Sequence, residues 1–308
     1  MDPLRFDGRV AVVTGAGRGI GRHYALLLAA RGAHVVVNDM GGSIGGTGSD
    51  DGPASAVAGA ITAAGGQATA DTNDVATDAG ARALVQTAVE TGGRIDVVVN
   101  NAGIVRWAGF PEADEENLAR HLAVHVAGSF HVTRAAWGHM VAQHYGRVVM
   151  TGSTGMFGLP TNTSYATAKA AVVGLTRSLS TAGRPHGIAV NLVAPAAMTR
   201  MAGPAGAGAD TGAGDGPMAP QLVAPLVAFL AHETCPVSGE MYAVGARRFS
   251  RMFIACTPGY LHPGADPTVE DVVAHFAEVN DETGYQVPAD LGDWSSSFLA
   301  HLPSGGGR

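Results

Sequence analysis

Short apolar runs rich in β-branched residues recur along the chain and are continuous rather than alternating in polarity. The clearest are "RVAVVT" (9–14), "AHVVVND" (33–39), "IDVVVN" (95–100), "RVVMTG" (147–152) and "IAVNLVA" (188–194). Strands that are buried on both faces of a parallel sheet show this pattern. "GQATAD" (66–71) and "EMYAVG" (240–245) are weaker candidates for further strands.

Segments of helical length separate these runs. Examples are "GRHYALLLAARG", "GARALVQTAVET" and "GSFHVTRAAWGHMV". Because strand and helix alternate, the pattern predicts right-handed crossovers and an α/β fold with a doubly wound parallel sheet, the Rossmann fold. We expect this domain to occupy residues 1–247.

The alternation stops after residue 247, and residues 248–308 are expected to form a helical C-terminal extension. Within it, "DPTVEDVVAHFAEVND" (266–281) has the pattern of one amphipathic helix. Asp266 would cap this helix, with Pro267 in its first turn. Two glycine-rich segments, 41–52 and 202–217, are predicted to be long loops.

Composition narrows the classes of partner. The net charge is −7 and there is no basic run, which argues against binding to nucleic acid or to an anionic membrane surface. No apolar stretch reaches the roughly 20 residues that span a bilayer. The N-terminal "MDPLRFDGR" lacks the regions of a signal peptide, so a cytoplasmic location is expected.

The sequence predicts no metal site. Cys235 and Cys256 fit no metal-binding spacing and are expected to be reduced thiols. His121 and His125 are four residues apart, but no third candidate ligand is near them in the sequence.

"TGAGRGIG" (14–21) follows the first predicted strand and opens the first predicted helix. Glycines at this place let the backbone approach a pyrophosphate, and the helix N-terminus supplies amide donors. Ile20 stands where the common dinucleotide motif has its third glycine. Asp39 ends the second strand, where a carboxylate can bind both hydroxyls of an adenosine ribose. Dinucleotide binding is therefore predicted.

Two charged residues point to different dinucleotides. Arg18 lies in the glycine turn, where a basic group could bind a 2′-phosphate. Asp39 lies where the ribose itself must sit and would repel that phosphate. Because Asp39 has the more direct contact, we expect NAD rather than NADP as the cofactor.

The only lysine of the chain, Lys169, follows Tyr165 by four residues in "SYATAK" (164–169). The other eighteen basic residues counted as Lys or Arg are all arginine. One explanation is an accidental choice at an exposed helix position. The other is a site that requires a compact ammonium rather than a planar guanidinium.

Five motifs in a fixed order resemble the short-chain dehydrogenase/reductase family. They are "TGAGRGIG", Asp74-Val75, "NNAG" (100–103), "YATAK" and "NLVAP" (191–195). The resemblance extends to about residue 245. It implies that the cofactor contacts come from these motifs, namely Gly15, Arg18, Gly19, Ile20, Gly21, Asp39, Asp74, Val75, Asn101, Ala102, Gly103, Tyr165, Lys169, Pro195 and Thr199.

The resemblance also implies that Tyr165 and Lys169 form the catalytic pair, with the lysine bound to the nicotinamide ribose. Spacing of four places both side chains on one face of a helix. Tyrosine titrates near 10, so proton transfer at neutral pH requires nearby positive charge to lower its pKa. Lys169 would supply such a charge, which is the simplest explanation for the single lysine.

Two further family positions depart from the usual pattern. The serine that binds the substrate oxygen usually lies thirteen residues before the tyrosine, but position 152 is glycine. Counting from the preceding strand assigns the role to Ser153, with Thr154 as the alternative. An asparagine that holds a water in a proton relay is replaced by His125. A purely structural histidine, bonded to backbone, is the alternative to a relay.

A closer resemblance links the chain to the (3R)-hydroxyacyl-CoA dehydrogenase modules of peroxisomal multifunctional enzymes. "VVVNDMGGSIGGTG" and "GSFHVTRAAWGHM" carry it, together with a C-terminal extension that in those modules helps form the dimer and its active sites. The expected activity is NAD-dependent oxidation of a secondary alcohol, either a 3-hydroxyacyl-CoA or a hydroxysteroid. A homodimer or homotetramer is expected. A non-catalytic NAD(H) sensor is the alternative from another class.

Overall fold

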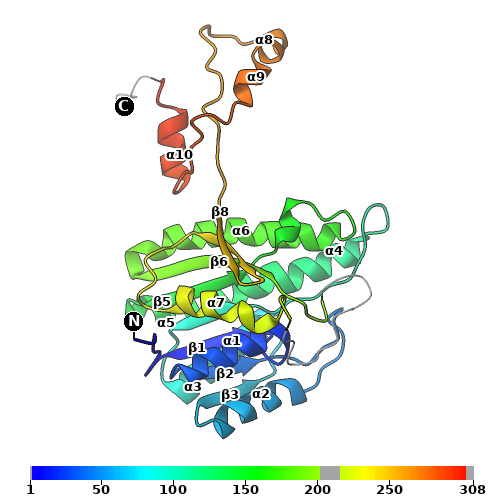
Figure 1. The fold of residues 1–308 in the computed structure, drawn as a ribbon, viewed down its shortest axis with the longest axis vertical. Helices are drawn as coiled ribbons and strands as arrows, with labels where there is room; N and C mark the ends of the chain where they lie inside the picture. Colours follow the sequence, from blue (N-terminus) through cyan, green and yellow to red (C-terminus); the bar gives the residue numbers. More distant parts are fainter. Residues whose placement is uncertain (1, 202–215, 303–308) are drawn as a thin grey trace. The chain divides into compact units, whose positions relative to one another are not determined.

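The computed structural model describes residues 2–201 and 216–302. Two compact units divide the chain, with the boundary between Arg251 and Met252. The first unit holds a sheet flanked by helices, and the second holds three short helices (Figure 1). The predicted glycine-rich loop at 202–217 lies, over residues 202–215, outside the described residues.

A single eight-stranded sheet organises the first unit, in the order β3-β2-β1-β4-β5-β6-β7-β8. In this order, each pair of neighbouring strands from β3 to β7 is parallel. The strands are β1 (Val10–Thr14), β2 (His34–Asn38), β3 (Gln67–Asp71), β4 (Val97–Asn100), β5 (Gly146–Thr151), β6 (Ile188–Ala196), β7 (Met241–Gly245) and β8 (Arg248–Met252). All seven predicted strands are present.

Side chains on both faces of the central strands are buried, which explains why these runs are apolar without alternation. In β1, for example, Val12 faces one side and Val13 the other, and neither is exposed to solvent. Val13 belongs to the core beneath α1, α2 and α7. The continuous pattern in the sequence is thus the signature of a sheet covered on both sides.

Helices cover both faces of this sheet. Helix α1 packs against α2 and α7, whereas α3 packs against α5 and α6 lies along β6 (Figure 1). Their bounds are α1 (Gly19–Ala30), α2 (Gly52–Ala63), α3 (Asp78–Gly92), α4 (Glu115–His121), α5 (Gly128–Gln143), α6 (Thr163–Gly183) and α7 (Ala224–Ala231). A π-helical turn, η1 (Leu122–Ala127), joins α4 to α5, and a 3₁₀ turn, η2 (Thr154–Phe157), follows β5. Two further 3₁₀ turns are η3 (Arg184–His186) and η4 (Pro220–Leu222).

The strand order reverses between β1 and β4, because the chain runs outward from β1 to β3 and then returns to pair β4 with β1. At such a switch point the loops after neighbouring strands diverge and open a crevice at the carboxyl ends of the strands. The loops after β1, β4 and β5 therefore meet at one edge of the sheet.

Strand β8 was not expected from the sequence. Ala246 and Arg247 have φ values of 47° and 63°, and they form the two-residue turn that connects β7 to β8. The side chains of β8 from Arg248 to Arg251 are exposed. A solvent-exposed edge strand leaves no apolar run in the sequence, so its pattern could not be recognised.

The helix predicted for residues 266–281 is wrong in two respects. The structure contains two short helices, α8 (Val269–Ala274) and α9 (Phe276–Val279), separated at His275. The N-cap of α8 is Thr268, not Asp266, and it forms a reciprocal capping box with Asp271. A third helix, α10 (Leu291–Phe298), follows.

Candidate active site

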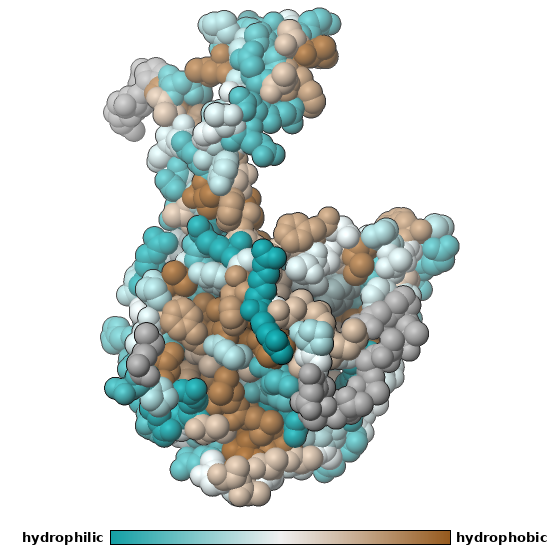
Figure 2. Space-filling model, viewed as in Figure 1, coloured by the Kyte–Doolittle hydropathy of each residue, from teal (hydrophilic) through white to brown (hydrophobic). Residues whose placement is uncertain are grey.

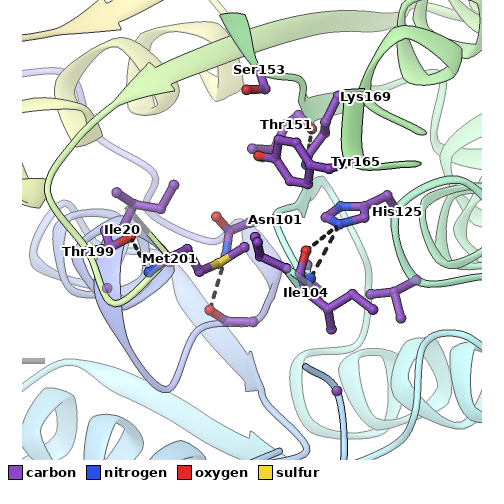
Figure 3. Close-up of a pocket in the computed structure, with 18 of the residues that line it drawn as sticks. Ile20, Asn101, Ile104, His125, Thr151, Ser153, Tyr165, Lys169, Thr199 and Met201 are labelled. Carbon is purple, nitrogen blue, oxygen red and sulfur yellow. Dashed lines mark hydrogen bonds between the residues drawn. The ribbon is translucent and has the colours of Figure 1, made fainter. Parts of the chain in front are cut away.

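One cavity of about 590 Å³ lies at the carboxyl edge of the sheet, and it gathers all the residues expected to bind cofactor or substrate. These are Gly15, Arg18, Gly19, Ile20, Gly21, Asp39, Asp74, Val75, Asn101, Ala102, Gly103, His125, Ser153, Thr154, Tyr165, Lys169, Pro195 and Thr199. They come from six strand ends and the helices that follow, so only the fold brings them together. Figure 3 draws 18 of the lining residues and labels ten of them.

Glycines are sterically required in the turn between β1 and α1. Gly15 has a φ of 63°, and a Cβ atom there would lie 2.9 Å from the Cα atom of Ala102. A Cβ atom on Gly21 would lie 2.3 Å from the carbonyl oxygen of Gly15. Gly21 therefore allows the start of α1 to pack closely against the turn at Gly15. Because Gly21 has this role, Ile20 can stand where the common motif has its third glycine. Arg18, the N-cap of α1, makes no side-chain capping bond, which leaves the first amides of the helix available to a pyrophosphate.

The "NNAG" segment holds this glycine turn in place. The side-chain amide of Asn101 donates to the carbonyl oxygens of Thr14 and Gly15, at 2.8 and 3.0 Å. The backbone amides of Asn101 and Ala102 both donate to the Thr14 hydroxyl at 2.9 Å. Loop and turn thus form one rigid cradle.

Asp39 ties the end of β2 to the same cradle. One of its carboxylate oxygens accepts from the Gly17 amide at 2.9 Å, and the other accepts from the Gly41 amide at 2.8 Å. A carboxylate oxygen can accept more than one hydrogen bond, so both keep capacity for ribose hydroxyls. Arg18 donates instead to the Gly42 carbonyl oxygen, at 3.5 Å. The adenosine end of the cavity therefore holds a carboxylate whose position is fixed by two backbone amides.

Asp74 and Val75 follow β3 at the same end of the cavity. The Asp74 carboxylate accepts from the Ala76 amide at 2.9 Å, and Val75 is buried. Thr199 follows β6 and accepts from the Met201 amide at 3.2 Å (Figure 3).

Tyr165 and Lys169 lie one turn apart near the start of α6, and the Lys169 nitrogen is 5.7 Å from the centre of the tyrosine ring. The lysine is fully inside the protein and donates to the Thr151 carbonyl oxygen at 2.7 Å. Burial lowers the pKa of the Lys169 ammonium to about 7. The accidental, exposed position considered for the single lysine is excluded.

Burial also raises the pKa of the Tyr165 phenol above its usual value, and the Ser153 hydroxyl opposes that rise as a hydrogen-bonding partner. Among the residues of this chain, burial is therefore stronger than the positive charge that the sequence led us to expect from Lys169. Lys169 is itself desolvated, and with a pKa of about 7 it is only partly charged near neutral pH.

Ser153 lies at the N-cap of the 3₁₀ turn η2, where its hydroxyl oxygen accepts from the Gly155 amide at 3.0 Å. Figure 3 shows Ser153 on the same side of the cavity as Tyr165 and Lys169. Thr154 lines the same cavity. Of these two hydroxyls, that of Ser153 is the hydrogen-bonding partner that affects the Tyr165 pKa, which is consistent with counting from the strand.

His125 lies in the π-helical turn η1, at the family position described as a helix kink. Its Nε2 is 2.9 Å from the Ile104 carbonyl oxygen, and its ring meets the Tyr165 ring edge-on at 5.4 Å (Figure 3). Burial, and then the charge of Lys169, lower the pKa of His125 well below its usual value. The residue is therefore neutral near pH 7, and its buried Nδ1 has no partner among the described residues.

His121 stacks on His125 with ring centres 5.9 Å apart, but it is bonded to backbone at both nitrogens. Within residues 2–201 and 216–302, no three His, Cys, Asp or Glu side chains converge as metal ligands. None of the helices described is both long and apolar enough to cross a membrane.

Sequence reasoning missed Asn162, which lines the cavity and caps α6 by accepting from the Tyr165 amide at 3.2 Å. The signal was available, since an asparagine three residues before a tyrosine on a helix is a typical N-cap. It also missed Trp107 and Arg200, which follow β4 and β6 and line the cavity. Loop residues of this kind carry no periodic pattern.

Comparison with known proteins identifies the family. A family model described as short chain dehydrogenase matches residues 9–208, which is more than half of the chain. The chain belongs to the short-chain dehydrogenase family. The predicted family and the predicted fold class are both confirmed.

Relatives agree with this assignment. Peroxisomal multifunctional enzyme type 2 of Mus musculus is 46% identical over 248 residues, which span 79% of this chain and 32% of the mouse protein. The chain thus spans about a third of that relative's length. The crystal structure of a short chain dehydrogenase from Mycobacterium avium matches with a TM-score of 0.79 and 36% identity, over 89% of this chain and 97% of that one. A 7α-hydroxysteroid dehydrogenase complexed with NADH matches with a TM-score of 0.69 and 28% identity, over 80% and 97%.

Proposed function

We propose that this short-chain dehydrogenase oxidises a secondary alcohol to a ketone with NAD⁺, and that its substrate is a 3-hydroxyacyl thioester. The observation that carries this proposal is the convergence, in one cavity, of the glycine cradle, Asp39 and the buried pair Tyr165 and Lys169. A protein that only sensed NAD(H) would need the cradle but not the pair.

The cradle residues fit a dinucleotide because Gly15 and Gly21 let the turn after β1 pack tightly against the loop after β4, and because the first amides of α1 receive no side-chain capping bond and are left for a pyrophosphate. Asp39 favours NAD, since a 2′-phosphate would meet its carboxylate. Bound NAD⁺ would accept a hydride from the carbinol carbon. The side chains of this chain carry out the proton transfer and bind the substrate oxygen.

Tyr165 is the general base that accepts the proton of the substrate hydroxyl. Its deprotonation becomes easier when positive charge is present beside it, and Lys169 and an oxidised nicotinamide ring both supply such charge. Lys169 is held by the Thr151 carbonyl oxygen, which fixes its ammonium beside the tyrosine ring. The same ammonium can donate to the nicotinamide ribose, because it has three donors.

His125 is proposed to take part in proton relay from Lys169 through a water. Nε2 lies 2.9 Å from the Ile104 carbonyl oxygen and 3.3 Å from the Ile104 amide nitrogen, and the shorter contact favours the tautomer in which Nε2–H donates to the carbonyl oxygen. In that tautomer the unpartnered Nδ1 is an acceptor. A neutral histidine held this way can accept a hydrogen bond from water without taking up a charge.

Ser153 is proposed to donate to the substrate oxygen. Ser153→Ala is expected to lower kcat by about 10²–10³-fold, the usual effect of removing one donor to a developing oxyanion. Thr154→Ala is the matched control, because it removes a neighbouring hydroxyl of the same cavity and is expected to change kcat by less than about threefold. Steady-state kinetics decide between them, and a larger loss in Thr154→Ala would favour the spacing counted from Tyr165.

The C-terminal unit is proposed to pack at the active site or at the interface between copies of the chain. Its apolar side chains lie mostly on its surface: Val269 and Val273 in α8 are 74% and 72% exposed, and Leu291 in α10 is 76% exposed. Figure 2 shows apolar colour reaching the surface of this unit. Because so few of its apolar residues bury one another, the unit needs another surface for stability.

A homodimer or homotetramer and a cytoplasmic location stay predictions.

The substrate class can be tested with paired substrates. We expect (3R)-hydroxyacyl-CoA esters to show a higher kcat/KM than the matching free acids, because remote contacts to the thioester arm help to position the carbinol carbon. The measurement is the appearance of NADH absorbance, with NADP⁺ as the control cofactor. Equal values for the two substrates would remove the thioester proposal. Activity on a hydroxysteroid alone would favour the alternative suggested by the structural relative.

A further inference from the structure

The chain between β2 and α2 forms a strap, residues 40–50, along one wall of the cavity. Four residues of the strap line the cavity, namely Met40, Gly42, Ser43 and Gly46. The two ends of the strap are joined, because the Asp50 amide donates to the Met40 carbonyl oxygen at 2.9 Å. These ends follow directly after Asp39, the carboxylate expected at the adenosine ribose. The strap therefore borders the adenosine half of the dinucleotide site.

The far end of the strap is a compact turn. The Ser43 amide donates to the Thr47 carbonyl oxygen at 2.8 Å, and the Gly46 amide donates to the Ser43 carbonyl oxygen at 3.0 Å. Gly46 has a φ of 79°, and a Cβ atom there would lie 2.8 Å from the Cγ2 atom of Ile104. The turn thus packs directly against the loop after β4, with no room for a side chain between them.

Two hydrogen bonds attach this turn to the body of the domain. The Val105 amide, in the loop after β4, donates to the Ile44 carbonyl oxygen at 2.9 Å. The Arg120 guanidinium, in α4, donates to the Gly46 carbonyl oxygen at 2.6 Å. A charged donor makes the stronger hydrogen bond of the two kinds. Arg120 is therefore the main side-chain fastening of the turn.

The contact with the strap is what holds Arg120 in place. Among residues 2–201 and 216–302, no carboxylate lies within ion-pair distance of its guanidinium, and the Gly46 carbonyl oxygen is its hydrogen-bonding partner. Arg120 lines the cavity and is only partly buried. A long side chain loses rotamer freedom when it is held in one position. The hydrogen bond to the strap offsets this loss.

We propose that Arg120 is a positioning residue that latches the strap in the conformation that binds NAD(H), and thereby sets the affinity for the adenosine half of the dinucleotide. The inference rests on the proposed function only through the binding of NAD(H), not through the identity of the alcohol. A strap that is in place before binding does not have to be ordered by the ligand. Without the latch, only a fraction of the molecules has the strap in place, and the apparent Kd rises by the inverse of that fraction.

The test measures ligand binding and the position of the strap separately. Arg120→Met removes every N–H donor of the guanidinium and keeps an apolar side chain. We expect the Kd values for NADH and for ADP, which carries the adenosine half alone, to rise by the same factor of about 3 to 10. Hydrogen exchange of the Val105 amide in the ligand-free protein should accelerate by about the same factor, because this amide donates to the strap. Saturating NADH should restore the protection.

A second variant reaches the strap from its other side. Gly46→Ala adds a Cβ atom against Ile104 at a residue with positive φ, and it leaves Arg120 unchanged. It should also weaken ADP binding and accelerate exchange at Val105. Arg134→Met is the matched control, because the Arg134 guanidinium in α5 lies 3.6 Å from the Asp78 carboxylate and does not line the cavity. It should change neither quantity.

The outcomes separate the latch from its alternatives. Weaker ADP binding in Arg120→Met without faster exchange at Val105 would mean that Arg120 contacts the dinucleotide directly, and would overturn the latch. Unchanged ADP binding in a variant whose thermal unfolding shows it to be folded would overturn it as well. Wild-type protein that binds NADH but oxidises no alcohol would overturn the proposed function and leave the latch standing.

Discussion

Tyr165→Phe is expected to lower kcat by about 10³–10⁴-fold while NAD(H) binds with nearly unchanged affinity. The substitution removes only the phenol oxygen, the group that exchanges a proton with the substrate. The ring keeps its edge-on contacts with His121 and His125, at 6.1 and 5.4 Å, so the wall of the cavity is preserved. Steady-state kinetics and titration of NADH fluorescence measure the two effects separately.

A matched control for this change is Tyr242→Phe, because Tyr242 in β7 is also partly buried but does not border the cavity. It should retain nearly full activity. In the wild type, kcat/KM for alcohol oxidation should rise with pH, since burial raises the pKa of Tyr165 and the base must lose its proton. A Tyr165→Phe enzyme with more than about a tenth of normal activity would show that another group accepts the proton.

Lys169→Met is expected to lower kcat by at least about 10²-fold and, at the same time, to stabilise the folded protein at neutral and acidic pH. The pKa of Lys169 is about 7 in the folded chain, against about 10.4 for an unfolded lysine. Below pH 7 the buried ammonium is charged in the folded state and its full desolvation cost destabilises the protein. Methionine has a similar length and no charge, so it avoids this cost.

The pH dependence has a definite sign. Between about pH 7 and 10.4 the unfolded chain binds more protons at residue 169 than the folded chain, so wild-type stability rises with pH there. The stability gained by Lys169→Met should therefore be about 1–4 kcal/mol below pH 7 and should shrink steadily above it. Denaturant unfolding of both proteins at several pH values measures this difference.

Lys169→Arg serves as the matched control. It keeps the charge but cannot lose a proton, and its planar guanidinium cannot occupy the place of the ammonium that donates to the Thr151 carbonyl oxygen. Both activity and stability should fall. A Lys169→Arg enzyme with a near-normal rate would falsify the explanation for the single lysine.

The sequence alone determined the features that depend on neighbours along the chain. The runs that form β1, β2, β4, β5 and β6 are apolar because both faces of the sheet are covered, and this burial leaves a readable pattern. The glycine turn and the spacing of Tyr165 and Lys169 are equally local. A turn with positive φ at Gly15 and a helix with i, i+4 neighbours are properties of short segments.

The edge strand β8 and the broken helix near His275 show where such patterns fail. Both lie at exposed positions, where side chains do not have to alternate or repeat for the structure to form. The apolar positions of "TVEDVVAHFAEV" suit a helix over its whole length, but Val269, Val273 and Phe276 are exposed, so no buried apolar face selects one straight helix. Periodicity predicts a helix only when a buried face selects it.

The tertiary structure decided the properties of the site. Residues more than twenty positions apart met at the strand ends, and their burial there fixed the pKa of Lys169 at about 7 and left His125 neutral. Desolvation depends on everything that surrounds a group, including segments distant in sequence, so no local pattern could have given the charges of this cavity.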